Sequence, residues 1–324
     1  MRIRGVTILP DGTAGATAAR LTADVRAWVE SPPLRRLVAH FGGDPPAGNL
    51  AATLAGLDDF SARHWDFRAG RERPEAREPA LDPATTRLVL AAAAALGLVH
   101  PVPPARPDYA HLVVLGGLAP ACLRRVAYAA HLLRTGPAVT GEVAVLGSFR
   151  PLAELEHRTL AEAGLPPCAT EVDVLDAAVR RVFGVPGPAD RDGHDADHPH
   201  HCWASRTYRP AGLPPVRVLA APSGDPGRRR AHTADTQRFW AGHVRLGPGD
   251  PVLAVTAPIY VPFQHCDALR TLALPYGCGV DTVGVDPALP DLARLPEPTL
   301  TPGRYLQEIR STLRSMRALH AALP

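Results

Sequence analysis

"HLVVLGGLAPACLRRVAYAAHLL", residues 111–133, decides the fold class of this chain. The stretch opens with an apolar run of strand length, turns at two glycines, and continues after a proline as an amphipathic helix. Similar apolar runs, alternating with amphipathic segments, follow along the chain. This alternation is typical of a parallel sheet with helices on both faces, because each crossover helix must cover the sheet.

Four further apolar runs predict strands, and five amphipathic segments predict helices. The strands are expected at 142–148, 216–223, 251–257 and 280–286, and the helices at 120–133, 152–164, 170–183, 233–244 and 261–274. We therefore predict an α/β domain at residues 108–290, with a Rossmann-like open parallel sheet of about five strands and helices on both faces.

The residues on either side of this domain predict helices. Residues 1–107 show helical patterns and predict an N-terminal helical region or lid, joined to the sheet by the proline-rich segment 101–107. Residues 291–324 predict a C-terminal helix. It is expected to pack on the body through regularly spaced apolar side chains, namely Leu306, Ile309, Leu313, Met316 and Leu319 or Leu323.

The composition excludes several classes of function. The 324 residues include no lysine, so mechanisms that need a lysine Schiff base or a P-loop lysine are excluded. The formal net charge is only +3, and basic residues alternate with acidic ones, which argues against nucleic-acid binding. Five cysteines without a CxxC spacing, and no apolar run of membrane-spanning length, predict a reduced, cytoplasmic protein that does not enter a membrane.

Ligands of open parallel sheets bind beyond the carboxyl ends of the strands, where loops and helix starts converge. After the first strand, Gly116 and Gly117 would let a ligand approach the backbone closely, and Arg124 follows on the next helix. The alternative is that the glycines only serve a tight turn, since the segment is not a GxGxxG dinucleotide motif.

The second strand is followed by Ser148 and Arg150 on the loop and by Glu156 in the first turns of the next helix. Ser148 and Arg150 are candidate ligand-binding residues, because a guanidinium is a planar two-pronged donor to phosphate or carboxylate. Glu156 is a candidate for proton transfer. An acidic residue at a helix start is also stabilising without any further function.

The third strand is followed by "GRRRAHTADTQRFW", residues 227–240. Arg229, Arg230 and Thr233 could hold an anion before a helix N-terminus, which already favours negative charge. His232 and Asp235 are candidates for proton transfer. The alternative interpretation is a solvated surface run of charge.

The fourth strand ends at Thr256, and Tyr260 and Gln264 follow it. Thr256 and Gln264 are candidate ligand-binding residues, and Tyr260 is a candidate for proton transfer because it lies on a converging loop. Cys266 has two interpretations, a small core residue or a nucleophile.

Two segments lie outside this pattern. Residues 187–203 are rich in His and Asp and lie within a predicted flexible insertion at about 186–212. They suit either an unstructured loop or a metal site, and we assign no metal ligand.

The segment 63–77 suits either a lid that lays arginines over the sheet edge or an aromatic anchor between the two parts of the chain. Its prominent residues are Trp65, Phe67, Arg68, Arg71 and Arg73.

Several of these pieces, taken in order, resemble the YdcF/SanA/ElyC-like superfamily of bacterial proteins. They are "VVLGG" at 113–117, Gly147 with Glu156, "HTADT" at 232–236 and "VTAPIYVPFQ" at 255–264. The resemblance covers about residues 108–286 and implies a Rossmann-like fold with a pocket at the sheet edge, and, as in some members, a nucleotide-like ligand or S-adenosylmethionine. This chain differs from the superfamily pattern of Asn, Glu, Asn and His at His232, Asp235, Thr236 and Tyr260.

Together these features predict a transferase or hydrolase that binds an anionic, nucleotide-like or phosphorylated small molecule, in a role such as specialised metabolite biosynthesis. One alternative is an S-adenosylmethionine-binding protein or transferase. Another is a non-catalytic sensor or assembly protein of the same fold, which the tyrosine at 260 favours. The cofactor, if any, stays open between S-adenosylmethionine and a nucleotide, and homo-oligomer formation stays open as well.

Overall fold

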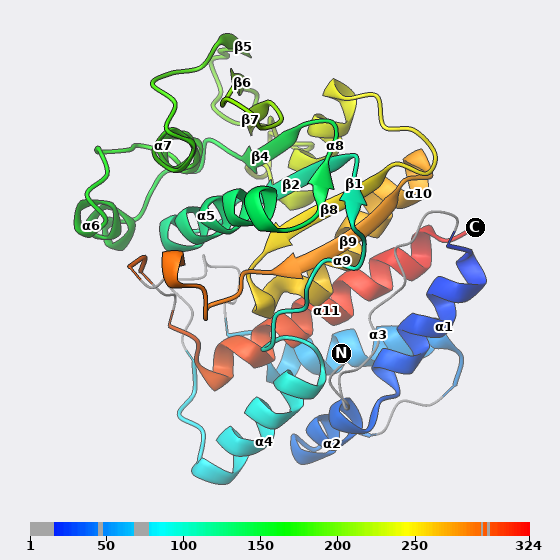
Figure 1. The fold of residues 1–324 in the computed structure, drawn as a ribbon. Helices are drawn as coiled ribbons and strands as arrows, with labels where there is room; N and C mark the ends of the chain where they lie inside the picture. The colour runs from blue at the N-terminus through cyan, green and yellow to red at the C-terminus, as the bar shows by residue number, and fades with distance from the viewer. Residues whose placement is uncertain (1–15, 45–47, 68–77, 293, 297–298) are drawn as a thin grey trace.

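The computed structural model describes residues 16–44, 48–67, 78–292, 294–296 and 299–324 (Figure 1). Within this part of the chain, the centre is a seven-stranded sheet with the spatial order β5-β6-β7-β4-β2-β8-β9. Five neighbouring strands are parallel: β7 (Val216–Ala220), β4 (Val143–Gly147), β2 (His111–Leu115), β8 (Pro251–Thr256) and β9 (Gly279–Gly284). They are the five strands that the sequence predicts, and the Rossmann-like α/β fold class is confirmed.

The order of the parallel strands determines where a ligand can enter. Numbered along the chain, their spatial order is 3-2-1-4-5, so the chain starts in the middle at β2 and builds outward in both directions. The loops that follow β2 and β8 therefore diverge to opposite faces. A crevice opens between the carboxyl ends of these two neighbouring strands, as in dinucleotide-binding folds.

Helices cover both faces of the sheet because successive strand residues point to opposite sides. One face, with Val114 and Val145, packs against α5 (Ala119–Thr135), α6 (Glu154–Glu162) and α7 (Glu171–Phe183). The other face, with Val113 and Ala144, packs against α8 (Thr233–His243) and α9 (Val261–Ala268). The chain continues from α9 through a π-helical turn, η3 (Leu269–Ala273), and α10 (Leu274–Tyr276) into β9.

A further helical layer covers α9. Its N-terminal helices are α1 (Ala18–Val29), α2 (Pro32–His40), α3 (Leu50–His64) and α4 (Pro83–Ala95), and α11 (Pro302–Ala322) lies between them and the sheet (Figure 1). The apolar positions predicted on the last helix are buried, and they join the N-terminal helices and the sheet in one hydrophobic cluster. The division of the chain at residues 107 and 291 stays a prediction.

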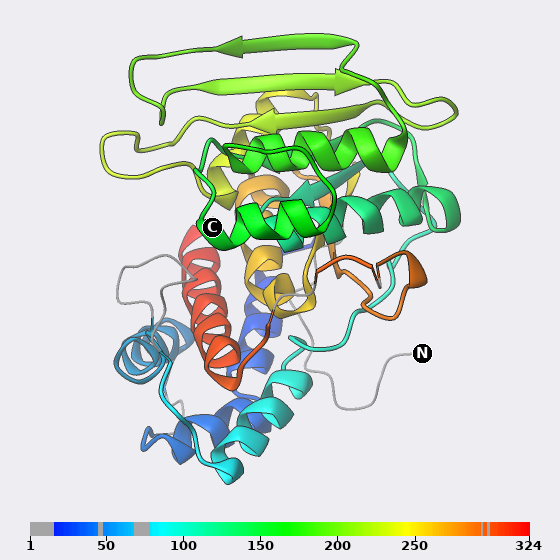
Figure 2. The same cartoon turned by 90° about the vertical axis from the view of Figure 1, so that its left-hand side faces the viewer.

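The segment at about 186–212, which the sequence predicts to be a flexible insertion, instead adds two strands to the sheet. β5 (Asp190–His194) and β6 (Trp203–Tyr208) form an antiparallel hairpin, and β6 pairs with β7 at the outer edge (Figure 2). Every β5 residue is exposed, so its strand geometry rests on backbone pairing with β6 rather than on an apolar pattern. Sequence periodicity therefore cannot detect it.

The segment 63–77 is described only up to Phe67, and Arg68, Arg71 and Arg73 lie outside the described residues. Trp65 is fully buried and packs edge-on against Phe60 and Phe41 of the N-terminal helices. The backbone N–H of Phe67 donates to Oε1 of Gln307 on α11 at 3.1 Å. The aromatic contacts of Trp65 thus lie within the N-terminal helices, and the choice between a lid and an anchor stays a prediction.

Two short strands and two 3₁₀ turns complete the described elements. β1 (Asp108–Tyr109) pairs with β3 (Ala138–Val139) beside the main sheet, and the turns are η2 (Pro258–Tyr260) and η4 (Pro290–Leu292). Within the ranges given above, every helix is too short or too polar to span a bilayer.

Candidate functional site

A cavity of about 830 Å³ lies beyond the carboxyl ends of the parallel strands. Residues from the loops after all five parallel strands line it, together with the first turns of α5, α7 and α8 and one face of α11. We call it the basic cavity. It lies where the strand order predicts a ligand site, with several helix N-termini directed at it.

The basic cavity gathers most of the candidate residues that the sequence predicts. Those that line it are Gly116, Gly117, Arg124, Ser148, Arg150, Glu156, Arg230, His232, Thr233, Tyr260 and Gln264. The candidates that do not line it are Arg229, Asp235 and Thr256. Thr256 is fully buried, and its hydroxyl donates to Oε1 of Gln264. For Thr256, therefore, the structure shows an internal hydrogen bond in place of the predicted ligand contact.

The charge of the lining is strongly positive. Among the described residues, seven arginines and three carboxylates line the cavity: Arg124, Arg125, Arg150, Arg230, Arg270, Arg304 and Arg314, with Glu156, Glu171 and Asp267. Guanidinium groups remain protonated at any physiological pH. A pocket closed by apolar side chains would have supported the non-catalytic alternative. The lining of this cavity instead includes charged side chains.

Arg150 and Glu156 form a buried two-pronged ion pair, so Arg150 is not a free anion clamp. Nη1 of Arg150 lies 2.7 Å from Oε2 of Glu156, and Nη2 lies 2.8 Å from Oε1. The same carboxylate accepts the backbone N–H groups of Ala119, at 2.8 Å, and Ala153, at 3.0 Å. Burial raises the pKa of Glu156, but the hydrogen bonds from Arg150 and Ala153 outweigh it and hold the pKa below its usual value. Glu156 therefore joins the starts of α5 and α6 as an ionised group.

Arg124 and Arg125 hold backbone carbonyls at the cavity wall. Nη1 of Arg124 donates to the carbonyl oxygens of Leu292 and Leu295, at 3.1 and 3.2 Å, and fixes the chain after β9. Nη1 of the fully buried Arg125 donates to the carbonyl oxygen of Leu115 at 2.7 Å, and its guanidinium lies 5.5 Å from the ring centre of Tyr260. Both arginines thus support the cavity, and the cation–π contact orients the predicted tyrosine.

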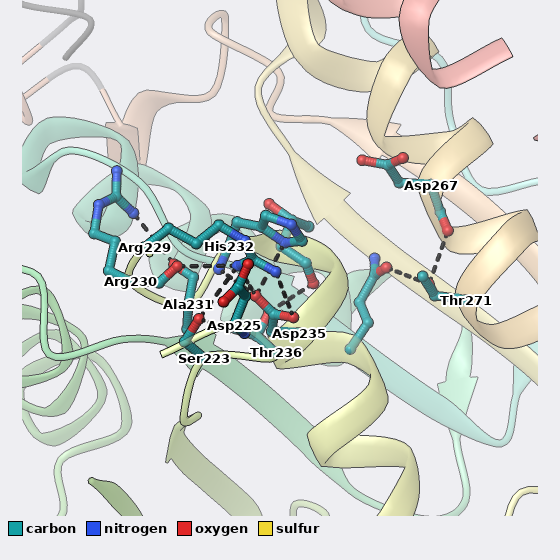
Figure 3. A network of polar contacts seen from close by, with 12 residues as sticks. Ser223, Asp225, Arg229, Arg230, Ala231, His232, Asp235, Thr236, Asp267 and Thr271 are labelled. Atoms are coloured by element: carbon teal, nitrogen blue, oxygen red, sulfur yellow. Dashed lines mark hydrogen bonds and ion pairs between the residues drawn. The ribbon is translucent and has the colours of Figure 1, made fainter. Parts of the chain in front are cut away.

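The arginine run before α8 contains a compact polar network (Figure 3). Asp235 accepts hydrogen bonds from the guanidinium of Arg229 and, at 3.0 Å, from the backbone N–H of His232. Nδ1 of His232 lies 3.2 Å from Oδ2 of the same carboxylate. Arg229 is therefore paired with Asp235 and does not line the cavity, which corrects its predicted role as a ligand clamp. The sequence alone does not show that Asp235 is its partner.

The network leaves His232 in the form of a proton acceptor. Burial raises the pKa of Asp235, but the hydrogen bonds from Arg229 and His232 outweigh it and lower the pKa, so Asp235 is ionised. Burial lowers the pKa of His232 by more than Asp235 raises it, so the imidazole is neutral at pH 7. A neutral imidazole keeps one ring nitrogen as a proton acceptor, and Nδ1 of this ring lies beside the Asp235 carboxylate.

Two acidic residues at the cavity are not among the candidates predicted from the sequence. Glu171, the first residue of α7, accepts the backbone N–H and the hydroxyl of Ser148 at 3.1 and 2.7 Å. Asp267 on α9 lies 3.4 Å from Nη2 of Arg270, and burial raises its pKa. Sequence reasoning missed both because their partners or the cavity itself appear only in the folded chain. An acidic residue in the first turn of a predicted helix was the one available hint for Glu171.

Gly116 is required by close packing. A Cβ at this position would lie 2.5 Å from Oε1 of Glu171 and 2.7 Å from the carbonyl oxygen of Leu146.

Cys266 is fully buried in the hydrophobic cluster, where burial raises the pKa of its thiol, in line with the core interpretation. In the described ranges, no group of three His, Cys, Asp or Glu side chains is arranged to hold a metal ion.

The fold and the cavity define this chain as a Rossmann-like α/β protein with an arginine-lined pocket at the carboxyl edge of its sheet. The family model described as the Rv3785 N-terminal domain matches residues 12–97. The uncharacterized protein Rv3785 of Mycobacterium tuberculosis (strain H37Rv) is 36% identical over 342 residues, covering 97% of this chain and 92% of the relative. The uncharacterized protein Mb3814 of Mycobacterium bovis matches with the same values. The chain belongs to the Rv3785 family. No solved structure matches it significantly.

Proposed function

We propose that this protein is an enzyme, a transferase or hydrolase, that binds a phosphorylated small molecule in the basic cavity. The observation that carries the proposal is the surplus of arginines over carboxylates in a cavity formed by helix starts at the carboxyl edge of the sheet. The predicted cytoplasmic location and role in biosynthesis belong to this proposal. Membership of the YdcF/SanA/ElyC-like superfamily remains a separate prediction, because this strand order is shared by unrelated families.

The anion would lie between Arg230, Arg314 and the first turn of α8. Arg230 and Arg314 both line the cavity, and the Arg314 side chain has no ion pair with any described residue. Thr233 and Ala234, at the start of α8, line the same wall, and the first N–H groups of a helix have no partner within it. Phosphate oxygens match both kinds of donor.

His232 would act as the general base. It lines the cavity, and its Nδ1 lies 3.2 Å from the Asp235 carboxylate. In a hydrolase, Nε2 would accept a proton from an attacking water, and in a transferase from a hydroxyl of the second substrate. The imidazolium formed in this way would be stabilised by the ionised Asp235.

Calorimetric titration with ADP, ribose 5-phosphate and inorganic pyrophosphate tests the anion site. We expect at least one probe to bind, and replacement of Arg230 and Arg314 together by Ala to raise its Kd about tenfold or more, because two charge-assisted contacts are lost. Arg228→Ala is the matched control, since Arg228 is exposed in the same arginine run but does not line the cavity. Failure of all three probes to bind, or an equal loss in the control, contradicts the proposal.

A second candidate is an S-adenosylmethionine-binding protein. It needs a carboxylate near the end of the second parallel strand to contact a ribose, and Glu171 lies there, bonded to Ser148. The sulfonium cation of this ligand fits an arginine-lined cavity poorly, which favours the phosphorylated ligand. A thermal-shift comparison of S-adenosylmethionine with ADP distinguishes the two; stabilisation by S-adenosylmethionine alone would establish the second candidate.

A further inference from the structure

Glu171 is a buried carboxylate with one oxygen engaged by the protein and one available to a ligand. Its side chain lines the basic cavity, and the residue is 7% exposed. Oε2 accepts both hydrogen bonds from Ser148, at the end of β4. Oε1 accepts no hydrogen bond from any residue in the described ranges.

The position of Oε1 is set by close contacts. It lies over Gly116, where any larger residue would place a Cβ 2.5 Å away. Ser148 holds the other oxygen of the same carboxylate, so the side chain cannot turn without losing both hydrogen bonds. The chain thus fixes an acceptor oxygen at the wall of the cavity, next to the loop after β2.

A purely structural role explains only half of this carboxylate. One oxygen is sufficient to tether α7 to β4 through Ser148. Oε1 lies at the wall of the cavity, where a donor group of a bound molecule can reach it.

The charges nearby select the kind of donor. Burial raises the pKa of Glu171 above its usual value and outweighs the positive charges of Arg150 and Arg230 and the hydrogen bonds from Ser148, which lower it. An ammonium group on the ligand would be repelled by Arg230, which lines the same cavity, whereas Arg150 is paired with Glu156. A hydroxyl group carries no charge, so it can donate to Oε1 without this repulsion.

We propose that Oε1 of Glu171 accepts a hydrogen bond from a hydroxyl group of a phosphorylated sugar or ribonucleotide bound in the basic cavity. This inference rests on the proposed function, since the phosphate of the same ligand lies against Arg230 and the start of α8. It assigns Glu171 to the recognition of the sugar part of the ligand.

The first test uses the wild-type chain and compares ligands that differ by one hydroxyl. Calorimetry compares ADP with 2′-deoxy- and 3′-deoxy-ADP, and ribose 5-phosphate with 2-deoxyribose 5-phosphate. We expect the loss of one hydroxyl to raise the Kd about tenfold or more, because the hydroxyl donates to a carboxylate oxygen that accepts no hydrogen bond from the described residues. The pair that shows the preference identifies a nucleotide or a simple sugar phosphate as the source of the hydroxyl.

The second test assigns the preference to Glu171. In Glu171→Ala, the ratio of deoxy to hydroxyl Kd values is expected to fall to within about twofold, since the acceptor is gone. Inorganic pyrophosphate, which has no sugar, should still bind this variant, because Arg230 and Arg314 remain in the cavity wall. The control Glu162→Gln, on an exposed residue outside the cavity, should keep the full preference.

The outcomes separate the two proposals. If pyrophosphate and the sugar ligands bind but no deoxy analogue is weaker, the hydroxyl contact is wrong and the anion site stands. A preference that survives in Glu171→Ala also overturns the assignment. If no phosphorylated probe binds, both proposals fail. Should the variant not fold, the wild-type comparison still overturns the proposal when no deoxy analogue binds more weakly.

Discussion

Asp235 determines what the arginine run before α8 can do. Its buried carboxylate accepts hydrogen bonds from the guanidinium of Arg229 and the backbone N–H of His232, and Nδ1 of the His232 ring lies 3.2 Å away. One of the arginines predicted to clamp a ligand is thereby used inside the protein, and a histidine ring is held beside a carboxylate. The adjacent Arg230 lines the cavity. Neighbouring arginines in one short run thus have different roles.

Asp235→Asn is expected to destabilise the protein in a pH-dependent way. The pKa of Asp235 is lowered in the folded state, so its ionised form contributes stability above the pKa of the unfolded chain, and this contribution is lost as the pH falls. We expect a loss of about 1–2 kcal/mol in the free energy of unfolding at pH 7, discounted because Arg229 is partly exposed. Urea unfolding between pH 3 and 8 should show the difference shrinking below about pH 4.

Asp225→Asn is the matched control, since Asp225 lies near Arg229 but forms no ion pair with it in the described structure. It should leave unfolding almost unchanged. A loss in Asp235→Asn that is the same at pH 3 and pH 7 would contradict the role assigned to the ionised carboxylate.

The helix starts around the basic cavity are tied to one another by side chains. Glu156 accepts the N–H groups of Ala119, the first residue of α5, and of Ala153, the residue before α6. Glu171, the first residue of α7, accepts the N–H group of Ser148, which follows β4. Acidic residues thus occupy N-terminal positions that a ligand could otherwise fill. The first turn of α8 also carries a carboxylate, that of Asp235, but Thr233 and Ala234 lie in the cavity wall with Arg230, which is why the anion is proposed there.

Glu156→Gln is expected to lower the free energy of unfolding by about 3 kcal/mol. The reason is that Arg150, which is largely buried, would lose its carboxylate partner and remain as an uncompensated cation. Glu154→Gln on the same helix is the control. Its ion pair with Arg158 is exposed on both sides, so the change should stay within about 0.5 kcal/mol. Equal effects of the two substitutions in urea unfolding at pH 7 would contradict the buried role of Glu156.

At the scale of the whole molecule, α11 joins the N-terminal helices to the sheet. Its buried side chains belong to the same hydrophobic cluster as Trp28 and Trp65 of the N-terminal region and Trp240 of α8. The cavity wall also includes α11, through Arg304 and Arg314. The helical regions at both ends of the chain therefore contribute to the stability and the shape of the site.

Leu313→Ala is expected to destabilise both parts of the molecule together, by about 3 kcal/mol, because it opens a cavity at a fully buried position of α11. Tryptophan fluorescence, which reports on both regions, and far-ultraviolet circular dichroism should follow one shifted transition in urea. Leu90→Ala, at an exposed position of α4, should change unfolding by less than about 0.5 kcal/mol. Separate transitions for the N-terminal helices and the sheet would contradict a shared core.

By itself, the sequence determined the five parallel strands, the helices between them and the apolar face of the last helix, because their patterns are local and repeat at the period of the element. It also placed most candidate residues at one sheet edge, since the carboxyl ends of parallel strands lie together. Only the tertiary structure decided that Arg150 and Arg229 are paired, that β5 joins the sheet, and that Glu171 reaches Ser148. The last contact joins residues that lie 23 positions apart, and such a pairing depends on how strands and helices pack rather than on any local pattern.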